Sequence, residues 1–281
     1  MGNDFEGIKP IYIREIFKSK NPSLAKILPG FVFRYIEKIV HQDEVNSFIK
    51  RHGNEQGLDF IKSAINEFAI NLTYEHVDRV PKKGRYIFAA NHPLGGFDGM
   101  LMMSILDKEF GEFRSLSNDL LMNITNLHSV LVPINKHGRQ DAEAAKIMDE
   151  IYNSKIQILT FPAGLVSRRI KGQIVDLDWK KNFITKAIQY NRDVVPVHIS
   201  GRNSEFFYRL GTIRKFLGIK ANLEMFYLVD ETFKHRNKSI NIKFGEPISY
   251  TIFDKTKKPA EWAKWIKEKV YALNGEYYIP L

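Results

Sequence analysis

His92 and Asp98 are the residues whose types and spacing first suggest acid–base chemistry. They lie in the Gly-rich stretch Asn91–Gly99, which directly follows the apolar run Arg85–Ala90. A carboxylate beside a histidine can fix the tautomer of the imidazole and stabilise the imidazolium while the ring removes a proton. The open alternative is structural, with His92 hydrogen-bonded at a strand end and Asp98 capping the following helix.

The elements around this stretch would place it at the edge of a sheet. The apolar run before it predicts a buried strand, and Met100–Leu106 after it predicts a helix. Leu72–His76 alternates like a strand, and Pro81–Gly84 turns the chain into the run that precedes His92. A strand end, a flexible turn and a helix start together form a common place for catalytic groups.

Strands and helices alternate along the rest of the chain. Further strands are expected at Phe113–Leu116, Val130–Ile134, Ile156–Phe161, Val194–Ile199 and Ile240–Phe244, and helices at Leu58–Ile70, Asp119–Leu127, Asp141–Tyr152, Lys180–Tyr190 and Pro259–Leu273. This alternation predicts an α/β fold with a single mixed β-sheet flanked by helices. Since no Pro/Gly/Ser-rich linker interrupts the chain, we expect one unit over residues 72–281, preceded by an N-terminal helical extension over residues 1–71.

Two segments combine aromatic and basic residues. Within residues 22–56, Phe31–Val40 has a helical pattern that suits either the surface of a membrane or a helix packed on the core. The segment Ser204–Lys220 has a similar mixture. We expect no transmembrane helix, because the longest uncharged run, residues 120–135, is broken by Asn, His and Pro, and we expect no signal sequence.

The charge balance and the absence of cysteine restrict the chemistry. The 281 residues include 42 Lys and Arg against 32 Asp and Glu, a net charge of +10, which favours polyanionic partners such as nucleic acid, anionic lipid or phosphorylated substrates. With no cysteine, disulfides, thiolate zinc sites and a Cys nucleophile are excluded.

Three later stretches also end apolar runs in polar groups. Phe161–Arg169 joins a strand end, a Pro-x-Gly turn and two arginines, a combination suited to holding a phosphate or a carboxylate. Val130–Lys136 ends another strand in a cation, with Arg139 just beyond, and Val194–Gly201 is a third strand that ends in polar residues.

In this order and spacing, the four stretches resemble the glycerolipid (lysophospholipid) acyltransferase family. Its hallmark is Asn-His, four further residues and Asp, followed by a Phe-Pro-Glu-Gly-x-x-Ser-Arg block. The resemblance runs from about residue 72 to residue 248 and includes Gly245–Ile248. More narrowly, Asn-His-Pro-Leu-Gly-Gly-x-Asp-Gly with Phe-Pro-Ala-Gly is similar to the bacterial branch labelled haemolysin-like, which includes acyltransferases that make ornithine and glycine lipids.

The resemblance implies an acyltransferase-like fold and a direct transfer without a protein nucleophile. His92 would remove the proton from an acceptor hydroxyl, Asp98 would orient His92, and the alkoxide would attack an acyl thioester. Backbone amides near Gly95 and Gly96 or near Gly164 are candidate donors to the oxyanion. The remaining candidates for substrate binding are Asn91, which either tethers the turn or is merely structural, together with Lys136, Arg139, Ser167 and Arg168.

Two departures from the family pattern stand out. Five residues separate His92 from Asp98, and an extra residue within a continuous helix would rotate the carboxylate by about 100°, so the insertion must be absorbed in a loop that Gly95 and Gly96 make possible. Ala163 stands where the wider family has a Glu associated with the glycerol-phosphate acceptor. An acceptor other than glycerol phosphate is therefore an open option.

The leading hypothesis is a peripheral O-acyltransferase that esterifies a lyso-lipid, either a lyso-glycine or lyso-ornithine lipid or a lysophospholipid. The expected donor is a thioester of acyl carrier protein or coenzyme A, with no cofactor or metal, and the expected location is the cytoplasmic face of the inner membrane, on anionic lipid. A 1-acylglycerol-3-phosphate acyltransferase is the alternative enzyme. A non-catalytic basic protein that binds lipid or nucleic acid is the alternative of another class; no nucleic-acid-binding signature supports it.

Overall fold

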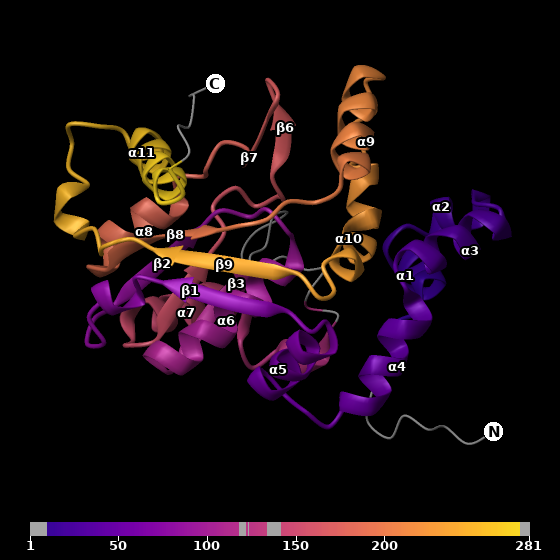
Figure 1. Ribbon diagram of the computed structural model, residues 1–281, viewed down its shortest axis with the longest axis horizontal. Coiled ribbons are helices and arrows are strands. Elements are labelled where there is room, and N and C mark those ends of the chain that lie inside the picture. Colours follow the sequence, from indigo (N-terminus) through magenta and orange to yellow (C-terminus); the bar gives the residue numbers. More distant parts are fainter. Residues whose placement is uncertain (1–9, 118–121, 123, 134–141, 276–281) are drawn as a thin grey trace.

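The fold is built on one seven-stranded sheet (Figure 1). A computed structural model describes residues 10–117, 122, 124–133 and 142–275. The strand order across the sheet is β1-β9-β8-β2-β5-β3-β4. The strands are β1 (Asn71–Glu75), β2 (Tyr86–Ala90), β3 (Phe113–Ser117), β4 (Leu131–Pro133), β5 (Gln157–Thr160), β8 (Asp193–Ile199) and β9 (Ser239–Phe244).

The sheet is mixed, as the sequence predicts. All neighbouring strands run parallel except β8 and β9, which pair antiparallel in the register Val197 to Phe244. Every residue of β2 and of β5 is buried. Parallel strands covered on both faces are apolar throughout, which explains why these runs do not alternate in the sequence.

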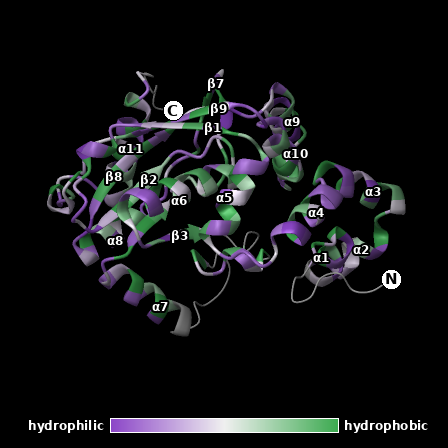
Figure 2. Ribbon diagram, turned by 60° about the horizontal axis from the view of Figure 1, so that its bottom comes forward, coloured by the Kyte–Doolittle hydropathy of each residue, from purple (hydrophilic) through white to green (hydrophobic). Residues whose placement is uncertain are grey.

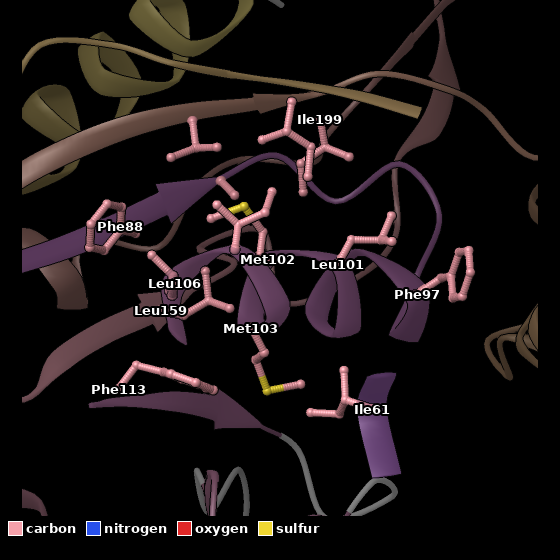
Figure 3. Packing of buried hydrophobic residues seen from close by; sticks show 14 of the residues in the cluster. Ile61, Phe88, Phe97, Leu101, Met102, Met103, Leu106, Phe113, Leu159 and Ile199 are labelled. Carbon is pink, nitrogen blue, oxygen red and sulfur yellow. The ribbon is translucent and has the colours of Figure 1, made fainter. Parts of the chain in front are cut away.

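Helices cover both faces of the sheet. On one face, α5 (Leu58–Glu67) and α6 (Gly96–Phe110) pack on the sheet, and Figure 3 shows Leu101 and Met102 on the side of α6 that faces the strands of Phe88 and Ile199. Helices α8 (Asn182–Tyr190) and α11 (Pro259–Ala272) cover the other face, where the core includes Ile87, Val194 and Ile266. The methionines after the Gly-rich turn thus belong to the core.

The N-terminal helices stand at one end of the molecule (Figure 2). They are α1 (Ile13–Lys20), α2 (Pro22–Ile27), α3 (Gly30–Ile39) and α4 (Gln42–His52). The ring of His41 stacks on Phe233 with centroids 3.9 Å apart, which joins these helices to α10 (Leu228–Lys234). Within the described residues, no helix is long and apolar enough to cross a bilayer. Helix α5, although part of the predicted extension, shares the main core.

The remaining elements lie around both ends of the central strands. A two-stranded antiparallel sheet, β6 (Arg168–Ile170) and β7 (Gln173–Val175), was not expected from the sequence. The other elements are α7 (Ala142–Asn153), α9 (Glu205–Phe216) and the 3-10 turns η1 (Val77–Arg79), η3 (Thr125–Leu127), η4 (Leu223–Tyr227) and η5 (Tyr250–Ile252). Of the helix expected at Asp119–Leu127, the described part is the single turn η3, while residues 118–121 and 123 lie outside the described residues.

Arg192 fastens the opposite, amino edge of the sheet. Its guanidinium is fully buried and donates to the carbonyl oxygens of Tyr152 at 2.8 Å, Ile156 at 2.9 Å and Ser154 at 2.7 Å. These carbonyls belong to the end of α7 and to the connection to β5. Without Arg192, they would be buried acceptors that lack donors. The arginine therefore substitutes for a helix cap.

Candidate active site

The Gly-rich turn is attached to the sheet through Asn91. This buried side chain donates from Nδ2 to the carbonyl oxygen of Ile199 at 3.0 Å, and the amide of Ile199 donates to Asn91 Oδ1 at 2.6 Å. The side-chain amide thus continues the pairing of β2 with β8 by one step beyond the last strand residue. Of the two roles left open for Asn91, the structure shows the tether.

His92 and Asp98 are in contact. Nδ1 of His92 lies 2.9 Å from Oδ2 of Asp98, and the same carboxylate oxygen accepts the backbone amides of Leu94 at 2.9 Å and Gly95 at 3.0 Å. The extra residue is accommodated before the helix begins, because Gly95 has φ +86° and ψ −137°, a conformation that only glycine adopts without strain. Helix α6 then begins at Gly96, with Asp98 in its first turn.

The pair combines a buried carboxylate with a partly accessible imidazole. Asp98 is fully buried, whereas the side chain of His92 is 18% exposed. Burial raises the pKa of the Asp98 carboxyl, and the hydrogen bonds from His92, Leu94 and Gly95 oppose that rise by favouring the charged form. The ring of His92 stacks on Phe161, with centroids 4.5 Å apart.

The hydrogen bond at Nδ1 determines which ring nitrogen can act as a base. A neutral imidazole that donates Nδ1–H to a carboxylate presents an unprotonated Nε2. No described residue is hydrogen-bonded to Nε2 of His92. This nitrogen is therefore placed to accept a proton from a bound hydroxyl.

Asp176 fixes the backbone of His92 through hydrogen bonds. Its Oδ1 accepts the amide of His92 at 3.2 Å and the hydroxyl of Ser167 at 2.6 Å, and the amide of Ser167 donates to the His92 carbonyl at 2.8 Å. Trp179 Nε1 donates to Oδ2 of this buried carboxylate at 2.9 Å, and the backbone amide of Asp176 donates to the Tyr271 hydroxyl at 2.8 Å. Sequence reasoning missed Asp176; the available signal was a carboxylate directly after the apolar pair Ile174 and Val175.

Arg168 is already engaged within the protein. Its guanidinium is 3.2 Å from Glu224 Oε1, donates to the Val166 carbonyl at 2.8 Å, and lies over the ring of Phe207. The residue is 4% exposed. The expectation that Arg168 holds a phosphate or carboxylate of the substrate is not supported by this arrangement, because the group has no free face. Ser167, bonded to Asp176, likewise has a structural position.

The glycine amides proposed as oxyanion donors divide into two groups. The amide of Gly95 donates to Asp98, and the amide of Gly164 donates to the Phe161 carbonyl at 2.9 Å, so neither is free. Gly96, in contrast, is exposed and opens α6, where the positive end of the helix dipole lies. Ala163 is buried beside Trp179 and Phe183 and offers no charge to a substrate.

Two predicted cations cannot be placed. Lys136 and Arg139 lie outside the described residues. Arg169, beside Arg168, donates from Nη2 to both carboxylate oxygens of Glu205, at 2.7 and 2.8 Å. Arg169, the more exposed arginine of the Phe161–Arg169 block, is therefore paired with a carboxylate of α9.

A buried carboxylate that orients a histidine at the carboxyl end of a parallel strand is an arrangement suited to general-base catalysis of group transfer. The family model described as Acyltransferase matches residues 15–277. The chain belongs to this acyltransferase family, which confirms the resemblance drawn from its motifs and excludes the reading as a non-catalytic binding protein.

Two relatives match nearly the whole chain. A lyso-glycine lipid O-acyltransferase of Bacteroides thetaiotaomicron is 46% identical over 264 residues, covering 94% of this chain and 97% of the relative. A lyso-glycine lipid O-acyltransferase of Phocaeicola vulgatus is also 46% identical, covering 94% and 95%. Among solved structures, the 1-acyl-sn-glycerophosphate acyltransferase PlsC of Thermotoga maritima is similar with a TM-score of 0.47 at 16% identity, over 89% of this chain and 95% of that one.

Proposed function

We propose that the protein transfers a fatty acyl group from a thioester to the hydroxyl of a lyso-glycine lipid. The observation that carries the chemistry is the contact between His92 Nδ1 and Asp98 Oδ2, which leaves Nε2 as the base. The choice of acceptor rests on the two relatives, each 46% identical over 264 residues.

In this mechanism, Nε2 of His92 takes the proton of the acceptor hydroxyl as the oxygen attacks the thioester carbonyl. The negatively charged Asp98 stabilises the imidazolium that forms. The exposed amide of Gly96 is our candidate donor to the oxyanion of the tetrahedral intermediate. When the intermediate collapses, the C–S bond breaks, and the imidazolium returns the proton to the leaving thiolate.

Two features argue against 1-acylglycerol 3-phosphate as the acceptor. Ala163 stands where the wider family has a Glu, and its side chain is buried in the core. Arg168, the first arginine of that block, is already paired with Glu224. A phosphate monoester would therefore lack the partners that the wider family pattern implies, whereas a glycine headgroup does not require them.

The proposed donor is acyl carrier protein or coenzyme A, and the proposed location is the cytoplasmic face of the inner membrane, as a peripheral protein on anionic lipid. The net charge of +10 supports both an acidic carrier and an anionic surface. The donors are distinguished by comparing rates with the same acyl chain on each carrier at low and high salt.

An acceptor panel tests the proposal. Purified protein is incubated with acyl thioester and with lyso-glycine lipid, lyso-ornithine lipid or lysophosphatidate, and products are followed by mass spectrometry. We expect diacyl glycine lipid to form fastest. The His92→Ala variant should no longer form it. Faster turnover of lysophosphatidate would contradict the acceptor, and an unimpaired His92→Ala enzyme would contradict the mechanism.

A further inference from the structure

The turn that joins α9 to η4, residues 213–223, exposes its apolar side chains to solvent. We call it the α9 turn. Phe216 is 89% exposed, Leu217 62% and Ile213 55%, and every residue from Lys215 to Leu223 is exposed. The buried face of α9, in contrast, includes the charged Arg214. Exposed apolar groups clustered in this way mark an interaction site.

The α9 turn is held rigid by hydrogen bonds from its buried side. The amides of Gly218 and Ile219 donate to the carbonyls of Lys215 and Arg214, each at 3.0 Å, with Gly218 at φ +70°, which is a Schellman ending of the helix. The Arg214 side chain donates to the Ile219 carbonyl at 2.6 Å and to Glu224 at 2.7 Å. A turn fixed before binding loses little conformational entropy when it binds.

The charge of the α9 turn is entirely positive. No Asp or Glu occurs between Glu205 and Glu224, and the exposed cations are Lys215 and Lys220 within the turn and Arg209 just before it on α9. Arg214, the fourth cation, is neutralised by Glu224. An apolar group flanked by basic side chains matches an anionic bilayer, in which the apolar residues enter the interface and the cations meet the headgroups.

We propose that the α9 turn docks the protein on an anionic lipid bilayer, with Phe216 and Leu217 inserted among the headgroups. This inference rests on the proposed function, since the lyso-lipid substrate resides in such a bilayer. In Figure 1, α9 stands beside β6, and Arg169 of β6 is paired with Glu205 at the start of α9. One end of α9 thus contacts the block next to His92, and the other end carries the docking residues.

The N-terminal helices adjoin η4, the element that follows the α9 turn. The hydroxyls of Tyr35 and Tyr227 are 2.6 Å apart, and the rings of Phe17 and Phe226 stack with centroids 6.0 Å apart. Element η4 therefore joins the N-terminal helices to the α9 turn, although these two parts of the chain are far apart in sequence.

A vesicle-binding assay with matched variants tests the proposal. Phe216→Glu/Leu217→Glu removes two exposed apolar residues of the α9 turn, and Ile147→Glu/Ile188→Glu makes the same change of charge at exposed positions on α7 and α8. Full-length proteins are sedimented with vesicles of phosphatidylcholine with or without phosphatidylglycerol. We expect binding to the anionic vesicles to fall at least about tenfold for the first variant and less than about twofold for the second.

Activity on acceptor in detergent micelles is measured in parallel. We expect both variants to keep wild-type activity there, which shows that they are folded. Equal vesicle binding by the two variants, or equal binding of the wild type to both kinds of vesicle, would overturn the proposal. So would self-association that Phe216→Glu/Leu217→Glu abolishes, since a second copy would then occupy the face. A wild type inactive on all acceptors, yet bound to vesicles through the α9 turn, would refute the proposed function and support this inference.

Discussion

Oδ2 of Asp98 lies 2.9 Å from Nδ1 of His92 although five residues separate them in the sequence. The same oxygen accepts the amides of Leu94 and Gly95, so three donors converge on one atom of a fully buried carboxylate. The geometry of the base is therefore set by the turn as a whole.

Substituting Asp98 by Asn is expected to lower kcat by about 10²–10⁴-fold while the protein remains folded. The amide keeps the shape of the carboxylate but removes the charge that stabilises the imidazolium and favours Nε2 as the base. Steady-state kinetics on the preferred acceptor, with circular dichroism as the folding control, provide the measurement. Wild-type kcat in Asp98→Asn would mean that the pair does not act in proton transfer.

Gly95 and Gly111 form a natural pair of test and control. Gly111 has φ +75° and ψ −132°, close to the values of Gly95, but it lies at the far end of α6, and nothing would contact an added Cβ within 4 Å. We expect Gly95→Ala and Gly111→Ala each to lose about 1–3 kcal/mol of unfolding free energy, measured in urea, because both are forced into a strained conformation.

Only Gly95→Ala should also lose activity, because its amide donates to Asp98 and a strained backbone at this position would displace that donor. Equal activity losses in the two variants would show that the effect is global and that the turn has no special place in catalysis.

Glu224 lies between Arg168 and Arg214, at 3.2 and 2.7 Å. Glu224→Gln leaves two buried guanidinium groups without a carboxylate, so we expect a loss of about 3–5 kcal/mol in the free energy of unfolding. Arg168→Met leaves the second ion pair intact and should cost clearly less. Chemical denaturation of both variants gives the ranking. The reverse ranking would contradict the central place given to Glu224. A rise in acceptor KM for Arg168→Met without any loss of stability would restore Arg168 as a substrate ligand.

His235 makes stability sensitive to acid. Burial lowers the pKa of this histidine, with Glu231 opposing the shift and Lys238 adding to it. The unfolded chain therefore binds a proton more readily than the folded protein, and folding stability is lost as pH falls below about 6.5. We expect His235→Gln to reduce this slope by at most about 1.4 kcal/mol per pH unit, since one proton is involved. Unfolding free energies measured between neutral and mildly acidic pH provide the test; parallel curves for wild type and variant would exclude His235.

The central strands could be predicted because burial on both faces makes β2 a continuous apolar run, and β1 could be predicted because its burial alternates from residue to residue. Each of the seven predicted runs agrees with the observed strand to within one residue at either end. Helix α6 is different, because it begins four residues before the predicted Met100, at Gly96. Its first turn contains Asp98 and two glycines, which an apolar pattern does not detect.

The partners of the site residues could not be predicted, because they depend on strand order and on distant loops. Strand β9 enters the sheet between β1 and β8, which no local pattern indicates. The pairing of Arg168 with Glu224 joins two segments that are distant in sequence. An arginine after a strand end gives the same sequence signal whether it binds a substrate or a carboxylate of its own chain. Burial distinguishes the two, and burial is a property of the fold.

Arg192 fixes the amino edge of the sheet. Its guanidinium ties α7, β2 and the entry to β5 together at the amino ends of the strands, using carbonyl groups of the backbone alone. This anchorage lies at the opposite edge of the sheet from His92, so a change in the glycine turn beside His92 leaves it untouched.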